Sequence, residues 1–302
     1  MDRSRIHQAA EILRKGGLVA FPTETVYGLG ADASNEKAVQ AVFRVKGRPD
    51  NHPLIVHLHS VAQVGDWAKS VPKAALDLGR KFWPGPLTLI LKKASRVSKV
   101  VTGGQETVGL RIPDHPVALA LLRKFGGGVA APSANRFGKV SPTTATHVKK
   151  DLGADVDFIL DGGPCTIGVE STIVDFSSGD PVILRPGGLT REKLEKALGR
   201  PVAVRGIGPV RVSGQLESHY APKAQVVAVT PGEVESKAAG LSRDGKKVVV
   251  LSMKDVTAKK LYASMRRADE SGADIIVVPT PDEKGLGLAV GDRLRKAAGR
   301  RS

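Results

Sequence analysis

Apolar residues recur along the chain in two spacings, which predict alternating strands and helices over the first 200 residues. Short apolar runs bounded by Gly, Pro and polar residues are typical of strands, whereas spacings of three and four are typical of amphipathic helices. The predicted helices span residues 4–15, 35–45, 72–83, 116–125 and 190–198. The predicted strands span residues 18–21, 54–59, 87–91, 107–112, 129–131, 158–161, 171–175 and 182–185. The last two strands are joined too tightly for a helical crossover, so we expect a mixed sheet.

The pattern changes after residue 200, where a stretch with several Gly and Pro residues has no convincing periodicity. We interpret residues 201–224 as a linker. The pattern then restarts, with strands at 225–229, 247–251 and 274–278 alternating with helices at 232–241, 257–270 and 285–298. This order predicts a small parallel unit. The chain is therefore expected to be an α/β protein with two domains. Residues 1–200 form a twisted mixed sheet with helices, and residues 225–302 form a smaller Rossmann-like α/β domain.

Polar and basic residues gather at two strand ends of the first domain. The first predicted strand is followed by the hydroxyl-rich turn PTETVYGLG (22–30), and a basic loop, KGRPDNHP (46–53), precedes another strand. Arg44, Lys46 and Arg48 place cations at alternate positions. Loops at strand ends are where α/β proteins bind ligands, and Gly and Pro let the backbone approach a ligand closely. The sequence therefore predicts a cleft for a phosphorylated small molecule.

Length and composition are those of a folded, two-domain protein. The chain has 302 residues, 41% of them hydrophobic, which suffices for buried cores. The single cysteine, Cys165, cannot form an internal disulfide, and we interpret it as a buried small residue. No apolar run approaches the ~20 residues of a membrane helix, and the N-terminus lacks the apolar segment of a signal peptide. We therefore expect a cytoplasmic protein with no membrane partner.

Positive charge dominates the chain, with 46 Lys and Arg residues against 30 Asp and Glu residues and a net charge of +16. This surplus fits either a solvated basic surface or attraction to a polyanion such as ATP or RNA. The cations are spread along the sequence, with small clusters at 92–99, 243–247 and 293–301. No RNA-recognition motif accompanies them. The G-x-x-x-x-G-K-[ST] motif is missing, and no G-x-G-x-x-G follows a strand.

Several ordered motifs nevertheless resemble those of one family. They are FPTETVYGLGADA (21–33), KGRPDNHPLIVHL (46–58), VGLRIPDHP (108–116), APSAN (131–135), SPT (141–143), GVESTIVD (168–175) and ILRPG (183–187). Together they resemble the YrdC family, the threonylcarbamoyl-AMP synthases, over roughly residues 5–200. SHYAPKA (218–224) is similar to the long, two-domain form of that family. The resemblance implies a YrdC-like domain, a linker that closes over the active site as a lid, and a C-terminal α/β domain.

Members of this family join L-threonine, bicarbonate and ATP into L-threonylcarbamoyladenylate and release pyrophosphate. The resemblance therefore implies a nucleotidyltransferase in the first step of threonylcarbamoyladenosine formation next to the tRNA anticodon. A separate tRNA threonylcarbamoyl transferase would use the product, so contact with tRNA is expected to be indirect. ATP and bicarbonate are expected as substrates, Mg²⁺ is expected to arrive with ATP, and no tightly bound cofactor is expected.

The resemblance also implies roles for single residues. The residues expected to contact threonine are Thr25, His57, Arg111, Ala131 and Ser171. Those expected to contact ATP are Arg48, His52, Thr107, Ser133, Asn135, Ser141, Arg185 and Tyr220. His52 stands where the family often has an asparagine. Catalysis is expected to come from positioning and from Lys46 and Arg48, which would stabilise charge on the phosphates. Lys46 is expected to face the same phosphates as Arg48 because alternate residues of an extended loop point the same way.

Structural roles compete with some of these assignments. Thr25 also suits a turn-stabilising hydroxyl, and Ser141 suits the N-cap of a helix after Pro142. His57 and His59 form a His-x-His pair, but no third ligand with suitable spacing accompanies them, so no metal site is expected. No nucleophile–base pair is recognisable, and no general base is assigned.

Two other functions remain open. A non-enzymatic, double-stranded RNA-binding protein would account for the charge but would not need the threonine-facing hydroxyls. A carbamoyl-transfer domain, as in hydrogenase-maturation proteins, would also contain a YrdC-like module. The chain has no paired cysteines for the zinc finger of such proteins.

Overall fold

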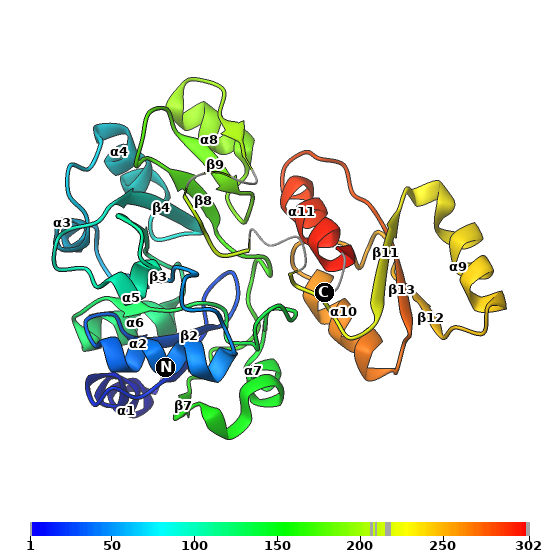
Figure 1. Ribbon diagram of the computed structural model, residues 1–302, viewed down its shortest axis with the longest axis horizontal. Coiled ribbons are helices and arrows are strands. Elements are labelled where there is room, and N and C mark those ends of the chain that lie inside the picture. Colours follow the sequence, from blue (N-terminus) through cyan, green and yellow to red (C-terminus); the bar gives the residue numbers. More distant parts are fainter. Residues whose placement is uncertain (1, 206–207, 209, 215–218, 300–302) are drawn as a thin grey trace.

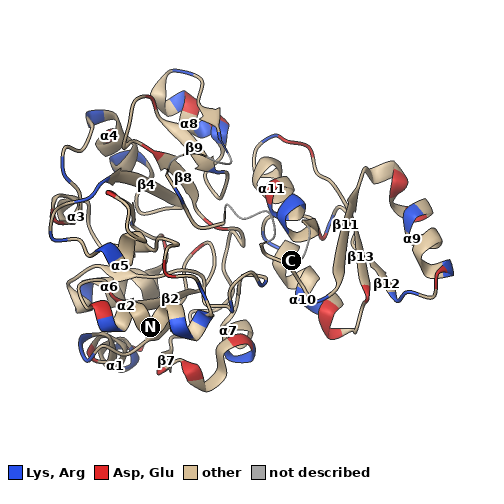
Figure 2. Ribbon diagram, in the orientation of Figure 1, with Lys and Arg blue, Asp and Glu red and all other residues tan. Residues whose placement is uncertain are grey.

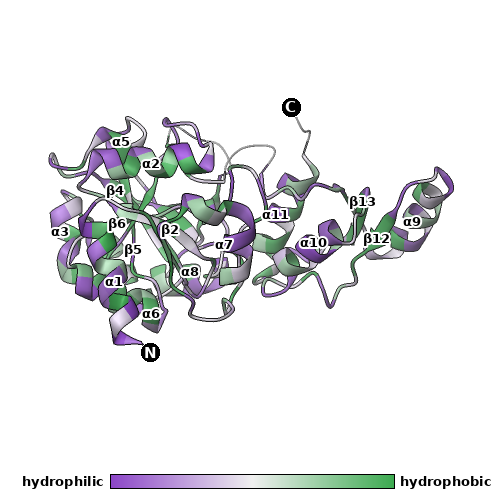
Figure 3. Cartoon of the chain, turned by 90° about the horizontal axis from the view of Figure 1, so that it is seen from below, coloured by the Kyte–Doolittle hydropathy of each residue, from purple (hydrophilic) through white to green (hydrophobic). Residues whose placement is uncertain are grey.

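The computed structural model describes residues 2–205, 208, 210–214 and 219–299. Figure 1 shows a larger body built around a long sheet and a smaller body built from the C-terminal quarter of the chain. In Figure 3 hydrophobic residues gather on the strands, and hydrophilic residues mark the outer faces of the helices. None of the helices in the described ranges has the length and apolar character needed to span a bilayer.

A mixed sheet forms the centre of the larger body. Its strands are β1 (Val19–Phe21), β2 (Gly28–Asp32), β3 (Ile55–His57), β4 (Leu87–Lys92), β5 (Thr107–Arg111), β6 (Val129–Ala130), β7 (Phe158–Ile159), β8 (Thr172–Asp175), β9 (Val182–Arg185) and β10 (Ala203–Val204). Within the described residues they lie in the order β10-β9-β8-β4-β5-β3-β6-β2-β1-β7. Parallel pairs such as β3–β5 stand beside antiparallel pairs such as β4–β5. The predicted mixed sheet is therefore confirmed.

Helices cover both faces of this sheet. They are α1 (Arg3–Arg14), α2 (Glu36–Lys46), α3 (Val64–Trp67), α4 (Lys73–Phe82), α5 (Lys99–Thr102), α6 (Pro116–Phe125), α7 (Ala145–Leu152) and α8 (Arg191–Leu198). Neighbouring strand residues point to opposite faces. Accordingly Phe21 of β1 packs in one core with α1 and α6, while Ala20 packs in a second core with the remaining helices. His57, a candidate site residue on β3, packs against Phe21 on the first face.

The smaller body is a three-stranded parallel unit. Its strands are β11 (Gln225–Val229), β12 (Val248–Val250) and β13 (Ile275–Pro279), in the order β11-β13-β12. Its helices are α9 (Val234–Arg243), α10 (Leu261–Glu270) and α11 (Gly287–Ala298). Its hydrophobic core also includes Val26, Val140 and Val169 of the larger body. The two bodies therefore share one continuous core, and relative motion between them is restrained.

Gly168 lies at a close contact between the two bodies. Its φ of +88° is in the left-handed region. A Cβ atom at this position would lie 2.5 Å from the carbonyl oxygen of Ala258, just before α10. Only glycine fits this backbone and this space without strain. Docking of the smaller body therefore shapes the GVEST segment, which also carries Ser171.

The structure corrects the expectation of a turn over residues 22–30. The turn ends at Tyr27, and β2 begins at Gly28, directly opposite Phe21 of β1. A Cβ atom at Gly30 would lie 2.8 Å from the Phe21 ring, so a small residue is needed there for packing. Glycines normally indicate turns and loops, so the strand that contains Gly28 and Gly30 was not predicted.

The structure also corrects the expectation of an extended basic loop from residue 46. Lys46 is the last residue of α2, and Gly47 caps the helix with a φ of 62°. The predicted linker likewise begins with a strand, because β10 pairs with β9. Residues 206, 207, 209 and 215–218 of that linker, including Ser218 of SHYAPKA, lie outside the described residues.

Candidate active site

The predicted site residues converge on one face of the large sheet. The β3–β5 register places His57 beside Arg111, and the β4–β5 register places Thr88 on the other side of Arg111. The PTET and APSAN turns, the GVEST segment, β9 and the linker complete the walls. Together they enclose a cavity of about 50 Å³. Segments far apart in the sequence therefore form one buried, polar site.

Eight predicted residues line this cavity: Arg48, His57, Arg111, Ala131, Ser133, Ser171, Arg185 and Tyr220. Glu170 and Ser213 line it as well and were not predicted, and His219, which precedes Tyr220 and could be expected to cover a nucleotide with it, also lines it. Thr25, Lys46, His52, Asn135 and Ser141 stand behind the wall, each hydrogen-bonded to a lining residue. Thr107 lines a smaller neighbouring cavity that shares Ile55 and Ser213 with the central one.

Arg111 is held by two residues of the PTET turn. Its Nη2 atom lies 2.8 Å from Oε1 of Glu24 and donates to Oγ1 of Thr25 at 2.8 Å. Oε2 of Glu24 accepts a hydrogen bond from the backbone N–H of Asp114 at 3.1 Å. Both side chains of the ion pair are only 5% exposed. Nε of Arg111 is buried and has no hydrogen-bond partner among the described residues, and Arg111 lines the cavity.

His57 stands next to this guanidinium as a neutral imidazole. Burial lowers the pKa of His57 to about 3, and the charge of Arg111 contributes to the same shift. The ring packs edge-on against Phe21, with 5.9 Å between centroids. A neutral ring beside a cation suits hydrogen bonding to a polar substrate rather than ion pairing.

Two further arginines meet at the linker. Arg185 donates from Nε and Nη2 to the Ser171 carbonyl at 3.2 and 2.9 Å, and from Nη1 to the Ser213 carbonyl at 3.1 Å. Arg48 donates from Nη2 to Oγ of Ser213 at 3.1 Å and to the Pro53 carbonyl at 3.1 Å. Burial lowers the pKa of Arg48 to about 10, so Arg48 remains charged at neutral pH. Neutral atoms of the linker residue Ser213 thus accept hydrogen bonds from two cations that are suited to binding phosphate.

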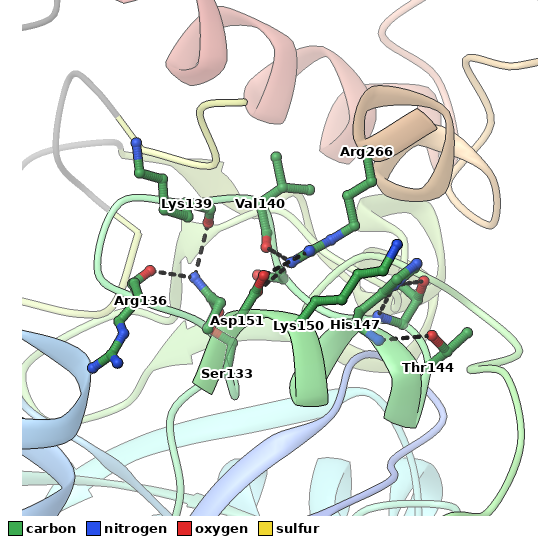
Figure 4. Close-up of polar contacts among 12 residues, drawn as sticks. Ser133, Arg136, Lys139, Val140, Thr144, His147, Lys150, Asp151 and Arg266 are labelled. Carbon is green, nitrogen blue, oxygen red and sulfur yellow. Dashed lines mark hydrogen bonds and ion pairs between the residues drawn. The ribbon is translucent and has the colours of Figure 1, made fainter. Parts of the chain in front are cut away.

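Lys46 supports the APSAN turn from behind. Its ammonium donates to the carbonyl oxygens of Ser133 and Asn135. Burial lowers the pKa of Lys46 well below its usual value, and the charge of Arg48 lowers it further. Nδ2 of Asn135 donates to the carbonyls of Arg136 and Lys139, at 2.7 and 2.9 Å (Figure 4). In this conformation Lys46 therefore fixes the turn that presents Ser133 to the cavity.

We expect Lys46→Met to destabilise the protein by about 2–4 kcal/mol. The change leaves two buried carbonyls without their donor, and each unsatisfied group costs ~1–3 kcal/mol. Urea unfolding checks this value, with Lys139→Met as the control, because the Lys139 side chain is exposed on the same turn. Equal unfolding free energies for the two variants would contradict this role of Lys46.

Tyr220 closes the cavity from the side of the smaller body. It has a positive φ of 60°, its ring stacks on Tyr262 of α10 at 5.9 Å between centroids, and Arg293 of α11 lies over it at 4.9 Å. Arg293 also donates from Nε to Glu170 at 2.7 Å. Glu170 accepts hydrogen bonds from Tyr262 and Ser141 as well, at 2.9 and 2.6 Å. The smaller body therefore contacts both Glu170, which lines the cavity, and Tyr220, the aromatic residue of the linker.

A second contact ties α7 to α10. Arg266 donates from Nη1 to Oδ1 of Asp151 at 2.9 Å, and its other terminal nitrogen contacts Asp151 and the Val140 carbonyl (Figure 4). Lys150 pairs with Glu270 at 2.6 Å. These ion pairs lie beside the shared hydrophobic core and hold the smaller body in a fixed orientation.

The missed residues differ in the signal they leave in the sequence. Glu24 and Glu170 lie inside the PTET and GVEST motifs, so a search for acids beside Arg111 and Ser141 could have found them. Arg293 leaves no signal, because a basic residue in a C-terminal helix is ordinarily solvent-exposed. In the part of the chain that the structure describes, no group of three or more His, Cys, Asp or Glu residues is placed to hold a metal ion.

Two family models match the chain. The Sua5–YciO–YrdC model, described as telomere recombination, matches residues 11–187. The model for the threonylcarbamoyl-AMP synthase C-terminal domain matches residues 189–299. The two matches meet between β9 and α8.

Relatives of known name match over nearly the whole chain. A threonylcarbamoyl-AMP synthase of Pyrococcus abyssi is 43% identical, covering 100% of this chain and 96% of that protein. One of Bacillus subtilis is 41% identical, covering 98% and 94%. The crystal structure of P. abyssi Sua5 complexed with L-threonine superposes with a TM-score of 0.95 at 42% identity. It covers 99% of this chain and 95% of that one.

Proposed function

Because the chain belongs to the Sua5–YciO–YrdC family and carries the threonylcarbamoyl-AMP synthase C-terminal domain, we propose that its central cavity makes threonylcarbamoyl-AMP. The reaction joins L-threonine, bicarbonate and ATP and releases pyrophosphate, which makes the chain a nucleotidyltransferase. The observation that carries this proposal is one cavity lined by Arg111 on one wall and by Arg48 and Arg185 on another; Nε of Arg111 lacks a hydrogen-bond partner among the described residues. A carboxylate and a triphosphate need such a pair of sites.

We assign L-threonine to the wall formed by the PTET turn, β3 and β5. Its carboxylate pairs with Arg111, and Thr25 orients that guanidinium from behind. The neutral His57 ring, the APSAN backbone at Ala131 and the Ser171 hydroxyl surround the rest of the amino acid. The structural similarity to the P. abyssi relative, whose crystal structure contains L-threonine, supports this assignment.

We assign the ATP phosphates to Arg48, Arg185 and Ser133. The remaining residues of the nucleotide site are His52, Thr107, Asn135, Ser141 and Tyr220, of which only Tyr220 faces the cavity directly. Mg²⁺ prefers carboxylate and phosphate oxygens. Glu170, which lines the cavity, and Glu24, which pairs with Arg111, are already engaged by Arg293 and Arg111. We therefore propose that Mg²⁺ enters on the phosphates of ATP.

The proposed chemistry has two steps. The threonine amine captures CO2 derived from bicarbonate and becomes a carbamate, with release of water. A carbamate oxygen then attacks the α-phosphorus of ATP, and the bond to pyrophosphate breaks. The chain contributes positioning, exclusion of water and cations that stabilise charge on the phosphates. Arg48 is the cation that faces the cavity, and Lys46 acts on the same step by holding the Ser133 turn.

ATP entry requires movement of the linker. A cavity of about 50 Å³ is far below the ~300–1,000 Å³ of ordinary ligand sites. Ser213, His219 and Tyr220 fill the space beside Arg48 and Arg185. We therefore propose that these linker residues withdraw when ATP binds and then close over it as the predicted lid. Such gating shields a labile carbamate from water.

Pyrophosphate release tests the function directly. The protein should release pyrophosphate from ATP only when L-threonine and bicarbonate are both present, with serine a poor substitute. Release independent of threonine would contradict the proposal. Bound ATP without any release would indicate a requirement for a further component.

Replacing Arg48 distinguishes the enzyme from an RNA-binding protein. We expect Arg48→Ala to weaken ATP binding at least tenfold, because a charge-assisted contact to phosphate is worth ~1.5–3 kcal/mol, and to leave RNA binding unchanged. Figure 2 shows Lys and Arg spread over both bodies rather than over one element. Calorimetric titration with ATP and with a double-stranded RNA checks both. Loss of RNA binding with ATP binding intact would favour the RNA-binding alternative.

The wider context follows from the chemistry of the product. A mixed anhydride of a carbamate and AMP is labile, so we propose that a tRNA threonylcarbamoyl transferase consumes it close to its source, in the cytoplasm. We divide the chain into a catalytic domain at 1–200, a linker at 201–224 and a C-terminal domain at 225–302. The C-terminal domain supports the lid through Tyr262 and Arg293.

A further inference from the structure

A second, larger cavity opens in the body that carries the catalytic site. It has a volume of about 810 Å³ and shares no lining residue with the central cavity. Its walls are the segment around Ser34, the end of α3, the loop of residues 93–99 and the glycines at 126–128. This volume lies within the range of nucleotide-sized ligand sites.

A buried cation lines this cavity. The Lys93 side chain is only 9% exposed, and its nearest carboxylate, Oε2 of Glu106, lies 3.7 Å from Nζ and is 74% exposed. That distance exceeds the 2.7–3.2 Å of a hydrogen bond. A buried ammonium normally needs close hydrogen-bonded partners. Within the described residues, Glu106 is therefore the one acid paired with the Lys93 ammonium, and its carboxylate is exposed to solvent.

The other charges of the cavity leave a positive surplus. Arg96 pairs with Asp66 at 3.0 Å. Glu36 accepts a hydrogen bond from the Ser98 hydroxyl at 2.6 Å. Glu36 keeps its negative charge in this hydrogen bond, and Lys99 has no ion pair among the described residues. The cavity is therefore lined by three cations, Lys93, Arg96 and Lys99, and by two carboxylates, Glu36 and Asp66.

The walls of this cavity are already tied together. The Ala94 N–H donates to the Trp67 carbonyl at 2.9 Å, and the Ala33 N–H donates to the Gly128 carbonyl at 3.0 Å. A Cβ atom at Gly128 would lie 2.4 Å from Cζ2 of Trp67, so the glycine run closes directly on the indole. A cavity held by such contacts binds without a large ordering cost.

We propose that this cavity is a second binding site for a small phosphate-bearing ligand, whose phosphate is held by Lys93 with help from Lys99. The position lies outside the catalytic cavity, so the site is independent of the proposed reaction. A mononucleotide fits the volume, the cations and the indole. An RNA strand would need a surface that extends beyond one buried lysine.

Tryptophan fluorescence tests the site, because the chain has two tryptophans and only Trp67 lines the cavity. Trp83 is buried elsewhere and donates to the Leu87 carbonyl. AMP and inorganic pyrophosphate should each change the emission of the full chain, and Trp67→Phe should abolish the change. Lys93→Gln should weaken binding at least tenfold, and Lys93→Arg should largely preserve it. Lys92→Gln, at the exposed neighbouring position, is the matched control and should bind normally.

Arg185→Ala tests whether the fluorescence change comes from binding in the central cavity. This variant should leave the fluorescence titration unchanged. Loss of the signal in Arg185→Ala would assign it to the catalytic site and overturn the proposal. An emission change that survives Lys93→Gln in the folded protein would also overturn it. Binding of a single-stranded oligonucleotide without binding of AMP would replace the small-ligand site by an RNA contact.

Discussion

Arg111→Met is expected to lower kcat/KM for L-threonine by at least about 100-fold. The guanidinium is the buried cation with an unpaired donor at the proposed threonine carboxylate. Removing one partner of a buried charge pair costs ~2–5 kcal/mol, and each 1.4 kcal/mol is a factor of ten. Initial rates of pyrophosphate release at varied threonine concentration give the value. Arg123→Met, at an exposed arginine on α6, is the matched control.

A second variant separates substrate binding from stability. Arg111→Met alone leaves Glu24 buried without its cation, which should cost ~3–5 kcal/mol of unfolding free energy. Adding Glu24→Gln removes that lone charge, so the double variant should recover much of the stability while remaining inactive toward threonine. Recovery of activity along with stability would show that Arg111 acts only through the fold.

Arg293→Met is expected to destabilise the protein by about 3–5 kcal/mol and to weaken ATP binding at the central cavity. The Arg293 side chain is fully buried and pairs with Glu170, so its removal leaves a buried carboxylate without its main cation. It also removes the cation over Tyr220, so the linker aromatic loses one of its two supports. Urea unfolding and ATP titration measure the two effects. Arg295 lies on the same helix and forms an exposed ion pair with Glu283. Arg295→Met should therefore change neither stability nor ATP binding.

The same ion pair gives the stability a defined pH dependence. Burial raises the pKa of Glu170, but the charges of Arg293 and Arg185 and the hydrogen bond from Ser141 more than offset this, and the pKa falls from 4.5 to about 2. Because the folded-state pKa is depressed, the stabilisation is fully present above pH ~4.5 and is lost as the pH falls toward 2. A shift of this size corresponds to about 3 kcal/mol.

Comparison of wild type with Arg293→Met across this window checks the sign. The stability difference between them should be constant above pH ~5 and should shrink as the pH approaches 2. A difference that stays constant down to the lowest accessible pH would mean that Glu170 does not titrate with Arg293.

The sequence predicted the fold to the extent that periodicity reports it. Most strands, and most helices of more than eight residues, lie close to their expected bounds, because each buries a regular apolar face. Helices α3 and α5 were missed, because four residues are too few to show a period. Strand β2 was missed because its glycines are required by Phe21 across the sheet, a contact between segments that no local pattern contains.

Residues of the cavity could be predicted from the sequence, but their arrangement in space could not. Arg48, Arg111 and Arg185 lie in separate motifs, and only the folded chain brings them to one cavity. Lys46 was expected in an extended loop beside Arg48, but the helix continues through it and turns its ammonium toward the APSAN carbonyls. The contribution of Arg293 depends on how the second domain docks, which the first 200 residues do not encode.

The linker is anchored on both sides of the residues that fill the cavity. On one side β10 pairs with β9, and on the other the Ala221 N–H donates to the Gly138 carbonyl at 2.9 Å. Because the segment is fixed at both ends, its effective concentration at the cavity is set by its length and does not depend on the protein concentration. The apparent ATP affinity is then the intrinsic affinity reduced by the fraction of molecules whose cavity is open. Under the proposed function, the linker would compete with ATP within the molecule, so dilution would not relieve this competition, and the linker length would set how much ATP is needed to displace it.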